Sequence, residues 1–274
     1  MSKQVHSTRV TVPDIRAQKG REKIVCLTAY TAPVAALLDP HVDVLLVGDS
    51  LGLVVHGLPT PTAVTLDMMI LHGQAVVRAS THALIVIDLP FGTFEGSPEQ
   101  AYASAVRVMK ETGCQAVKVE AGEALAGTVA FLVQRGVPVM GHVGLRPQAV
   151  HIDGGFKAKG RDDDERARVI AEARAVAEAG CFALVLEGVA ESLAEEITRT
   201  LRVPTIGIGA SPSCDGQILV TDDMLGVFEW SPKFVRRYAD LRATITGAVA
   251  QYAADVRAAT FPGDAEVYRF KRKS

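Results

Sequence analysis

Tryptophan, basic charge and long apolar runs are scarce in this chain. Among 274 residues there are 1 Trp and 5 Tyr, and aromatic side chains make up 5% of the sequence. Lys and Arg (29) nearly balance Asp and Glu (31), giving a formal net charge of −2. Without a basic surface or aromatic side chains for stacking, the composition indicates neither nucleic acid nor an anionic membrane as a partner.

Cysteine and histidine motifs are missing as well. The four cysteines are scattered with no C-x-x-C pair, and no two of the seven histidines have H-x-x-x-H spacing. This excludes the usual zinc-site patterns and favours buried free thiols in a reducing compartment. No apolar run is long enough to span a bilayer, and residues 1–21 lack the apolar core of a signal peptide. We therefore expect a cytoplasmic protein.

A short β-branched or apolar run followed by a helical pattern recurs about eight times along the chain. The predicted strands are 24–28, 44–47, 83–89, 115–120, 137–140, 182–187, 204–208 and 217–220. Right-handed crossovers between parallel strands favour closure into a barrel, and barrels of about 250 residues are commonly single domains. We predict an α/β fold, a (β/α)8 TIM barrel formed by one domain over residues 1–274. Residues 1–21 form an N-terminal segment, and residues 232–274 add a C-terminal helical extension and tail.

Four predicted strands end in or beside a carboxylate: Asp49, Asp88, Glu120 and Glu187. A buried charge without a partner is costly, and the carboxyl ends of barrel strands are where such enzymes place their active sites. Asp49, Asp88 and Glu120 are hard oxygen donors of the kind that Mg²⁺ prefers. The alternative for each of them is a helix cap or a loop hydrogen bond.

Lys118 and Glu120 are two residues apart on one predicted strand, so both point to the same side. Lys118 is interpreted as a partner of Glu120, a site for an anionic substrate, or an amine for Schiff-base chemistry. Glu187 follows the apolar run 184–186, and apolar surroundings favour the role of general base near neutral pH. Its alternative is an ion pair with a nearby Lys or Arg.

Two further polar residues are candidates for substrate contacts. Ser50 adjoins Asp49 and can donate its hydroxyl to a substrate, but no G-x-S-x-G elbow surrounds it, so a nucleophilic role is not expected. His142 follows the strand predicted at 137–140 and either contacts substrate or is a core or loop histidine with satisfied hydrogen bonds. The long loop at 56–63 is typical of a lid over an active site.

Eight motifs stand in the order found in the ketopantoate hydroxymethyltransferase family. They are VGDSLG at 47–52, DLPF at 88–91, VKVE at 117–120, GHVGLRPQ at 141–148, GGFK at 154–157, LE at 186–187, IGIGA at 206–210 and DGQILV at 215–220. The resemblance covers residues 4–263, nearly the whole chain. Any single motif is modest evidence, whereas eight in register are strong.

The resemblance implies a barrel of the phosphoenolpyruvate mutase and isocitrate lyase type. It implies transfer of a hydroxymethyl group from the co-substrate 5,10-methylenetetrahydrofolate to 3-methyl-2-oxobutanoate, giving 2-dehydropantoate (ketopantoate) in the first step of pantothenate synthesis. It further implies one Mg²⁺ per subunit and assembly as a homodecamer. The residue roles that it implies are Asp49, Asp88 and Glu120 for the metal, Asp49, Ser50, Asp88 and Lys118 for the substrate, and Glu187 as the catalytic base.

The chain departs from the family pattern at Thr31, at Ser211-Pro212 and at Glu229-Trp230, none of which is a metal or base position. Three rival interpretations stay open. They are a related barrel enzyme that makes or breaks a C–C bond in another 2-oxo acid, a Schiff-base aldolase using Lys118, and a catalytically silent barrel that serves as a scaffold.

Overall fold

The computed structural model describes residues 9–269, so the expectations for residues 1–8 and for the tail beyond 269 lie outside it. The described residues form two compact units, which divide between Thr221 and Asp222. The division falls before residue 232, where the C-terminal extension was expected to begin.

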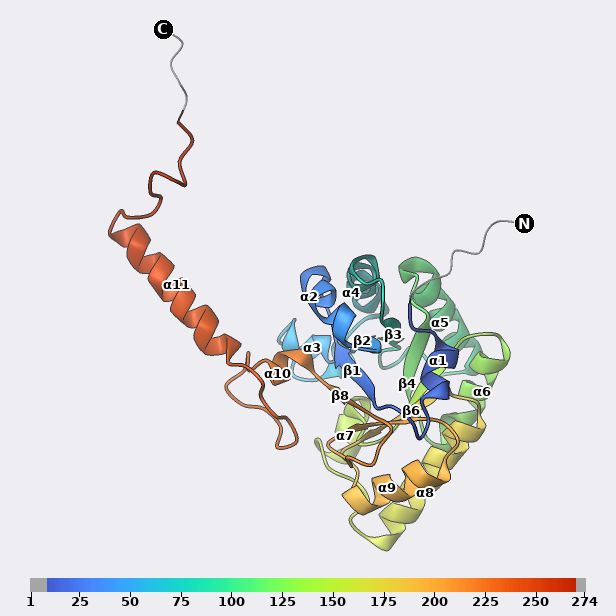
Figure 1. Ribbon diagram of the computed structural model, residues 1–274. Coiled ribbons are helices and arrows are strands. Elements are labelled where there is room, and N and C mark those ends of the chain that lie inside the picture. Colours follow the sequence, from blue (N-terminus) through green and yellow to red (C-terminus); the bar gives the residue numbers. More distant parts are fainter. Residues whose placement is uncertain (1–8, 270–274) are drawn as a thin grey trace, which may run out of the picture. The chain divides into compact units, whose positions relative to one another are not determined.

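The first unit is a closed barrel of eight parallel strands (Figure 1). Each strand pairs with the next one in the chain, and β1 also pairs with β8, which closes the barrel. The predicted fold is therefore confirmed. The strands are β1 (Ile24–Thr28), β2 (Val44–Val47), β3 (Leu84–Asp88), β4 (Ala116–Glu120), β5 (Val139–Gly144), β6 (Ala183–Glu187), β7 (Thr205–Ile208) and β8 (Gly216–Leu219).

The largest difference from the predicted strands is at β5. The strand predicted at 137–140 begins at Val139 and continues to Gly144, so His142 lies inside β5 and not in the loop after it. The other strand ends agree with the prediction to within one residue. The glycines at 141 and 144 serve close packing. A Cβ at Gly141 would stand 2.5 Å from Val176 on the helix outside β5, so glycine lets that helix approach the strand.

Helices surround the barrel, and the longer ones contact their neighbours around it. They are α1 (Val12–Ala17), α2 (Ala32–Leu38), α3 (Leu51–Val54), α4 (Leu66–Ala79), α5 (Pro98–Thr112), α6 (Ala126–Gln134), α7 (Val150–Asp153), α8 (Asp163–Glu178) and α9 (Glu191–Thr200). The next helix, α10 (Thr221–Met224), begins at the last residue of this unit. Four short 3-10 helices, η1 (Asp39–His41), η2 (Pro61–Ala63), η3 (Glu123–Leu125) and η4 (Pro147–Ala149), lie in the connections. The described residues 209–215 between β7 and β8 contain no helix, so the alternation is incomplete there.

Local sequence explains where the longer helices begin and end. The side chains of Thr65, Ser97 and Asp162 each accept a hydrogen bond from a backbone N–H of the first turn that follows. The helix α5 ends at Gly113, whose φ of 80° is in the left-handed region that glycine adopts readily.

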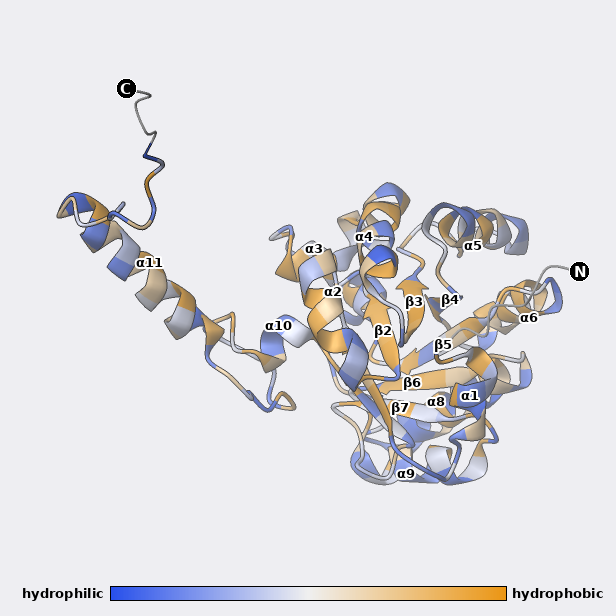
Figure 2. Ribbon diagram, turned by 45° about the horizontal axis from the view of Figure 1, so that its top comes forward, coloured by the Kyte–Doolittle hydropathy of each residue, from blue (hydrophilic) through white to orange (hydrophobic). Residues whose placement is uncertain are grey.

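The core has two layers. One lies between strands and helices, and the other fills the barrel with side chains such as Leu46, Val86 and Ile206. Figure 2 shows that strands such as β2 and β3 are hydrophobic along their length, as expected of parallel strands covered on both faces. Ile15 of α1 is 1% exposed and belongs to the inner layer, so α1 packs against the interior of the barrel.

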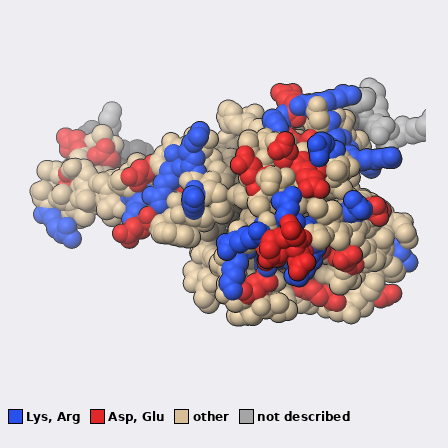
Figure 3. All heavy atoms as spheres, turned by 90° about the horizontal axis from the view of Figure 1, so that it is seen from below, with Lys and Arg blue, Asp and Glu red and all other residues tan. Residues whose placement is uncertain are grey.

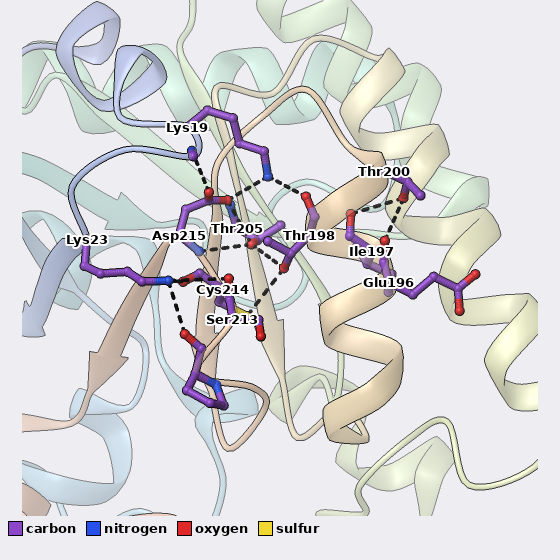
Figure 4. Close-up of polar contacts among 12 residues, drawn as sticks. Lys19, Lys23, Glu196, Ile197, Thr198, Thr200, Thr205, Ser213, Cys214 and Asp215 are labelled. Carbon is purple, nitrogen blue, oxygen red and sulfur yellow. Dashed lines mark hydrogen bonds and ion pairs between the residues drawn. The ribbon is translucent and has the colours of Figure 1, made fainter.

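The segment between α1 and β1 is tied to the seam where the barrel closes (Figure 4). Lys19 Nζ lies 2.8 Å from Asp215 Oδ2, and the same carboxylate accepts the backbone N–H groups of Gly20 (2.9 Å) and Thr205 (2.8 Å). Lys23 donates to the backbone carbonyls of residues 212–214. These contacts hold β7 and β8 at their amino ends, opposite the expected site.

In the second unit, the extension forms a helix, α11 (Leu241–Arg257), capped by Asp240. Four exposed apolar residues recur along it at helical spacing: Ile245, Val249, Tyr252 and Val256. In the part of the chain that the structure describes, no helix combines the length and apolar character needed to cross a membrane. Acidic and basic side chains lie interspersed on the face drawn in Figure 3.

Candidate active site

The four predicted carboxylates come from the same end of the barrel. Asp88, Glu120 and Glu187 are the last residues of β3, β4 and β6, and Asp49 follows β2 closely. Because all strands run parallel, their carboxyl ends share one rim. The side chains of Asp88 and Glu120 are only 3% and 5% exposed, whereas that of Glu187 is 18% exposed.

Lys118 of β4 forms an ion pair with a carboxylate of the neighbouring strand β3 and not with Glu120 of its own strand. Strand register places Asp88 beside Lys118, and Lys118 Nζ lies 3.0 Å from Asp88 Oδ1. The other oxygen, Asp88 Oδ2, accepts the backbone N–H of Asp49 at 3.0 Å. Lys118 and Glu120 both point inward, as their spacing predicted, but the suggested ion pair between them is replaced by the pair with Asp88.

A buried histidine connects this pair to the expected base. His142 Nδ1 lies 3.3 Å from Lys118 Nζ, and His142 Nε2 lies 3.3 Å from Glu187 Oε2. An ammonium group has only donors, so Nδ1 must accept and the ring proton must sit on Nε2, facing Glu187. Burial and the charge of Lys118 lower the pKa of His142, which favours this neutral form. His142 Nε2 therefore faces Glu187 at ion-pair distance, without a hydrogen-bond partner among the described residues, a contact that the sequence did not suggest.

The cluster is short of positive charge. Burial raises the pKa of Asp49 to about 7, and the neighbouring Asp88 carboxylate adds to this shift. Burial and the charge of Asp49 raise the pKa of Glu120 well above its usual value. Burial lowers the pKa of Lys118, but the carboxylates of Asp88, Asp49 and Glu120 outweigh it and leave the pKa raised. Lys118 thus stays an ammonium ion, one cation among three buried carboxylates.

Glycine at the end of β5 positions the base. Gly144 has a φ of 95°, and a Cβ there would stand 2.4 Å from the backbone oxygen of Glu187. That oxygen instead accepts the backbone N–H of Leu145 at 2.8 Å. Only glycine allows β5 to approach the end of β6 this closely.

Ser50 is held by a residue that the sequence reasoning missed. Its hydroxyl lies 2.8 Å from the hydroxyl of the buried Tyr30, which follows β1. The Tyr30 carbonyl accepts from His72 Nδ1 at 2.6 Å, and His72 Nε2 lies 3.0 Å from His56 Nε2 in the loop predicted as a lid. The Ser50 hydroxyl is thus fixed by its hydrogen bond to Tyr30. The only sign of Tyr30 in the sequence was that an aromatic hydroxyl follows a predicted strand.

Gln148 is the second missed residue. Its side-chain Nε2 donates to Asp49 Oδ2 at 2.8 Å, and its backbone N–H donates to Glu120 Oε2 at 3.0 Å. It is 7% exposed. The only sign of Gln148 in the sequence was that a polar residue follows Pro147 at the end of the GHVGLRPQ motif at 141–148.

The donor set fits a divalent cation in its chemistry. Asp49, Asp88 and Glu120 offer hard oxygen atoms, and the raised pKa values of Asp49 and Glu120 show that added positive charge would be favourable. Within residues 9–269, no three His, Cys, Asp or Glu side chains are already gathered closely enough to hold an ion. Hydrogen bonds from Gln148 and the ion pair with Lys118 occupy the oxygens instead.

Solved structures of similar fold define the class of barrel. A 2,3-dimethylmalate lyase, a member of the phosphoenolpyruvate mutase and isocitrate lyase superfamily, matches with a TM-score of 0.59 at 16% identity, over 94% of this chain and 91% of that one. A phosphonopyruvate hydrolase in complex with oxalate and Mg²⁺ matches with a TM-score of 0.60 at 13% identity, over 94% and 92%. The chain has the fold of this superfamily, as predicted.

Sequence comparison defines the family. The sequence model of the ketopantoate hydroxymethyltransferase family matches residues 9–264 of this chain. A 3-methyl-2-oxobutanoate hydroxymethyltransferase of Hyphomonas neptunium is 64% identical over 273 residues, covering 100% of this chain and 99% of that protein. One from Phenylobacterium zucineum is 68% identical, covering 95% and 94%. The chain belongs to the ketopantoate hydroxymethyltransferase family.

Proposed function

We propose that this protein transfers a hydroxymethyl group from 5,10-methylenetetrahydrofolate to 3-methyl-2-oxobutanoate, giving 2-dehydropantoate in the first step of pantothenate biosynthesis. One water is consumed and tetrahydrofolate is released. Family membership supports the overall reaction. The observation that carries the mechanism is the chain of contacts from Asp88 through Lys118 and His142 to Glu187.

We assign one Mg²⁺ per subunit to Asp49, Asp88 and Glu120. When bound, the ion would polarise the keto oxygen of the substrate, which makes the adjacent C3 proton more acidic. The raised pKa values of Asp49 and Glu120 support this assignment, since burial and then neighbouring carboxylates disfavour their charged forms and a bound cation would favour them.

The other roles follow from the chemistry of each side chain. The ammonium of Lys118 binds the substrate carboxylate, and the Ser50 hydroxyl, held by Tyr30, donates to the same substrate. Glu187 takes the proton from C3, and the resulting carbanion forms the new bond to the folate-derived methylene carbon. Water then replaces the folate nitrogen on that carbon, which leaves the hydroxymethyl group on the product and a proton on the released tetrahydrofolate. His142 lines the substrate site, with its Nε2 3.3 Å from Glu187 Oε2 but not hydrogen-bonded to it.

The rival functions fit the geometry less well. A Schiff-base aldolase needs a neutral amine, whereas the carboxylates around Lys118 raise its pKa and hold it as an ammonium. A silent scaffold would not need a buried carboxylate cluster, because such groups cost stability when they are not used.

We also propose a cytoplasmic homo-oligomer, a decamer by family resemblance. Its support is the apolar stripe on α11, formed by Ile245, Val249, Tyr252 and Val256, which no other element of residues 222–269 buries. Sedimentation of the full chain should show an assembly larger than a dimer. A monomer would contradict this part of the proposal.

Exchange of the substrate C3 proton with deuterium tests the base. NMR of 3-methyl-2-oxobutanoate with Mg²⁺ and without folate should show rapid exchange with the wild-type protein. Glu187→Gln should slow exchange by about 10²- to 10⁴-fold, the usual range for losing a general base, with metal binding retained. Glu191→Gln, an exposed carboxylate at the start of α9, is the matched control and should leave exchange unchanged. Rapid exchange in Glu187→Gln would remove that residue from the role.

A further inference from the structure

Gln148 joins the carboxyl ends of three consecutive strands. Its side-chain Nε2 donates to Asp49 Oδ2 after β2 (2.8 Å) and to the backbone carbonyl of Leu89 after β3 (3.0 Å). Its backbone N–H donates to Glu120 Oε2 at the end of β4 (3.0 Å). One residue therefore contacts two of the three carboxylates assigned to the metal and the chain beside the third.

The local sequence frees the backbone donor. Gln148 lies in the short helical turn η4, whose first position is Pro147. The first N–H groups of a helical turn have no partner within the turn, so the N–H of Gln148 is available to Glu120. Proline at the first position fixes the backbone for this geometry.

Hydrogen-bond chemistry fixes the orientation of the amide. Both neighbours of Nε2, the Asp49 carboxylate and the Leu89 carbonyl, are acceptors, so a flipped amide would place oxygen against oxygen. The other amide atom, Oε1, is buried and has no hydrogen-bond partner among the described residues. A buried acceptor without a partner is costly, and a water that arrives with a cation would supply the missing donor.

We propose that Gln148 is a positioning residue that holds the Asp49 and Glu120 carboxylates in the arrangement that receives the divalent cation. The inference rests on the metal assignment made above and adds to it a residue that does not itself supply charge. Groups that orient metal ligands in this way typically change metal affinity by about 10- to 100-fold when they are removed.

The test compares two variants that lose the amide in different ways. Gln148→Met keeps the side-chain volume without hydrogen-bonding groups, and Gln148→Ala also leaves a cavity. Gln74→Met is the matched control, because Gln74 is a glutamine of α4 whose Nε2 likewise donates to a backbone carbonyl, that of Glu111. Binding of Mn²⁺ to the full-length protein without substrate is measured by electron paramagnetic resonance of the free ion. Melting temperature is recorded with and without Mn²⁺.

If Gln148 positions the ligands, Gln148→Met and Gln148→Ala weaken Mn²⁺ binding by the same factor, about 10- to 100-fold, and both lose most of the ion-induced rise in melting temperature. Gln74→Met binds like the wild type. A merely structural role gives another pattern, in which ion-free melting falls, most in Gln148→Ala, and Mn²⁺ affinity is unchanged. That pattern, or wild-type affinity in Gln148→Met, would overturn the inference.

The two proposals fail differently. If the wild-type protein binds Mn²⁺ and Gln148→Met binds it equally well, only the role of Gln148 is wrong. If affinity falls as expected but the wild type does not exchange the C3 proton, the role of Gln148 stands and the proposed reaction is wrong. If the wild type binds no Mn²⁺, the metal assignment and this inference are both overturned.

Discussion

The buried carboxylate of Asp49 makes the ion-free protein less stable at neutral pH than in mild acid. Its pKa is about 7 in the folded protein, against an ordinary value of 3.8. Because the folded pKa is the higher one, the folded state binds the proton more tightly than the unfolded chain does. The resulting stabilisation is fully present below pH 4, falls as pH rises and is lost above pH 7.

The magnitude follows from the linkage between proton binding and folding. Each pH unit inside this window changes the free energy of unfolding by about 1.4 kcal/mol for one proton, so the loss between pH 5 and 7 is roughly 3 kcal/mol. Asp49→Asn removes the titration, and its amide oxygen can still accept the hydrogen bond from Gln148. Without Mg²⁺ the variant should therefore be more stable than the wild type at pH 8, and the difference should shrink toward pH 5.

This difference is measured by urea unfolding of the wild type and Asp49→Asn from pH 5 to 8. Both proteins are held at the same protein concentration, in EDTA. Saturating Mg²⁺ should then stabilise the wild type by about 3 kcal/mol at 100 times the dissociation constant, but have little effect on Asp49→Asn. A difference that stays flat from pH 5 to 7 would refute the reasoning, as would a variant less stable than the wild type at pH 8 in EDTA.

Two further substitutions test opposite ends of the barrel. Lys118→Met removes the ammonium paired with Asp88. Binding of 3-methyl-2-oxobutanoate, measured by calorimetry at fixed Mg²⁺, should therefore weaken at least about tenfold, and unchanged affinity would contradict the role of Lys118. Asp215→Asn removes the ion pair with Lys19 at the amino ends of β7 and β8 and should cost about 2 kcal/mol in urea unfolding at pH 7 while kcat is unchanged. The pKa of Asp215 is lowered, because the hydrogen bonds from Lys19 and Thr205 outweigh burial. The stability lost in Asp215→Asn should therefore become smaller as pH drops below 4. A loss of stability that persists below pH 4 would contradict this explanation.

Short-range patterns in the sequence were sufficient to predict the barrel. Most strands are largely apolar runs buried on both faces, and the bounds of β1 and β2 matched the prediction. The convergence of carboxylates was also predictable, since a residue at the carboxyl end of any parallel strand must reach the same rim. Asp88, Glu120 and Glu187 could therefore be placed together without knowing the register between strands.

Partners across strands could not be predicted in the same way, because they depend on register and on loops. The spacing of Lys118 and Glu120 showed that they share a face, but only the pairing of β3 with β4 places Asp88 next to Lys118. His142 was placed after a strand predicted to end at residue 140, whereas the strand continues to Gly144. Gln148 is 99 residues from Asp49, a separation at which no local pattern indicates a contact.

The site separates four carboxylates into two kinds by their surroundings. Asp49, Asp88 and Glu120 are buried and joined to one another through backbone N–H groups and Lys118, so their charges are committed to whatever cation lies there. Glu187 is more exposed, on a strand not adjacent to theirs, and its ion-pair-distance neighbour is the neutral His142. A carboxylate that does not hold a cation is free to take a proton from a substrate. This difference in partners supports the proposed division of roles, in which the three buried carboxylates hold the cation and Glu187 acts as the base.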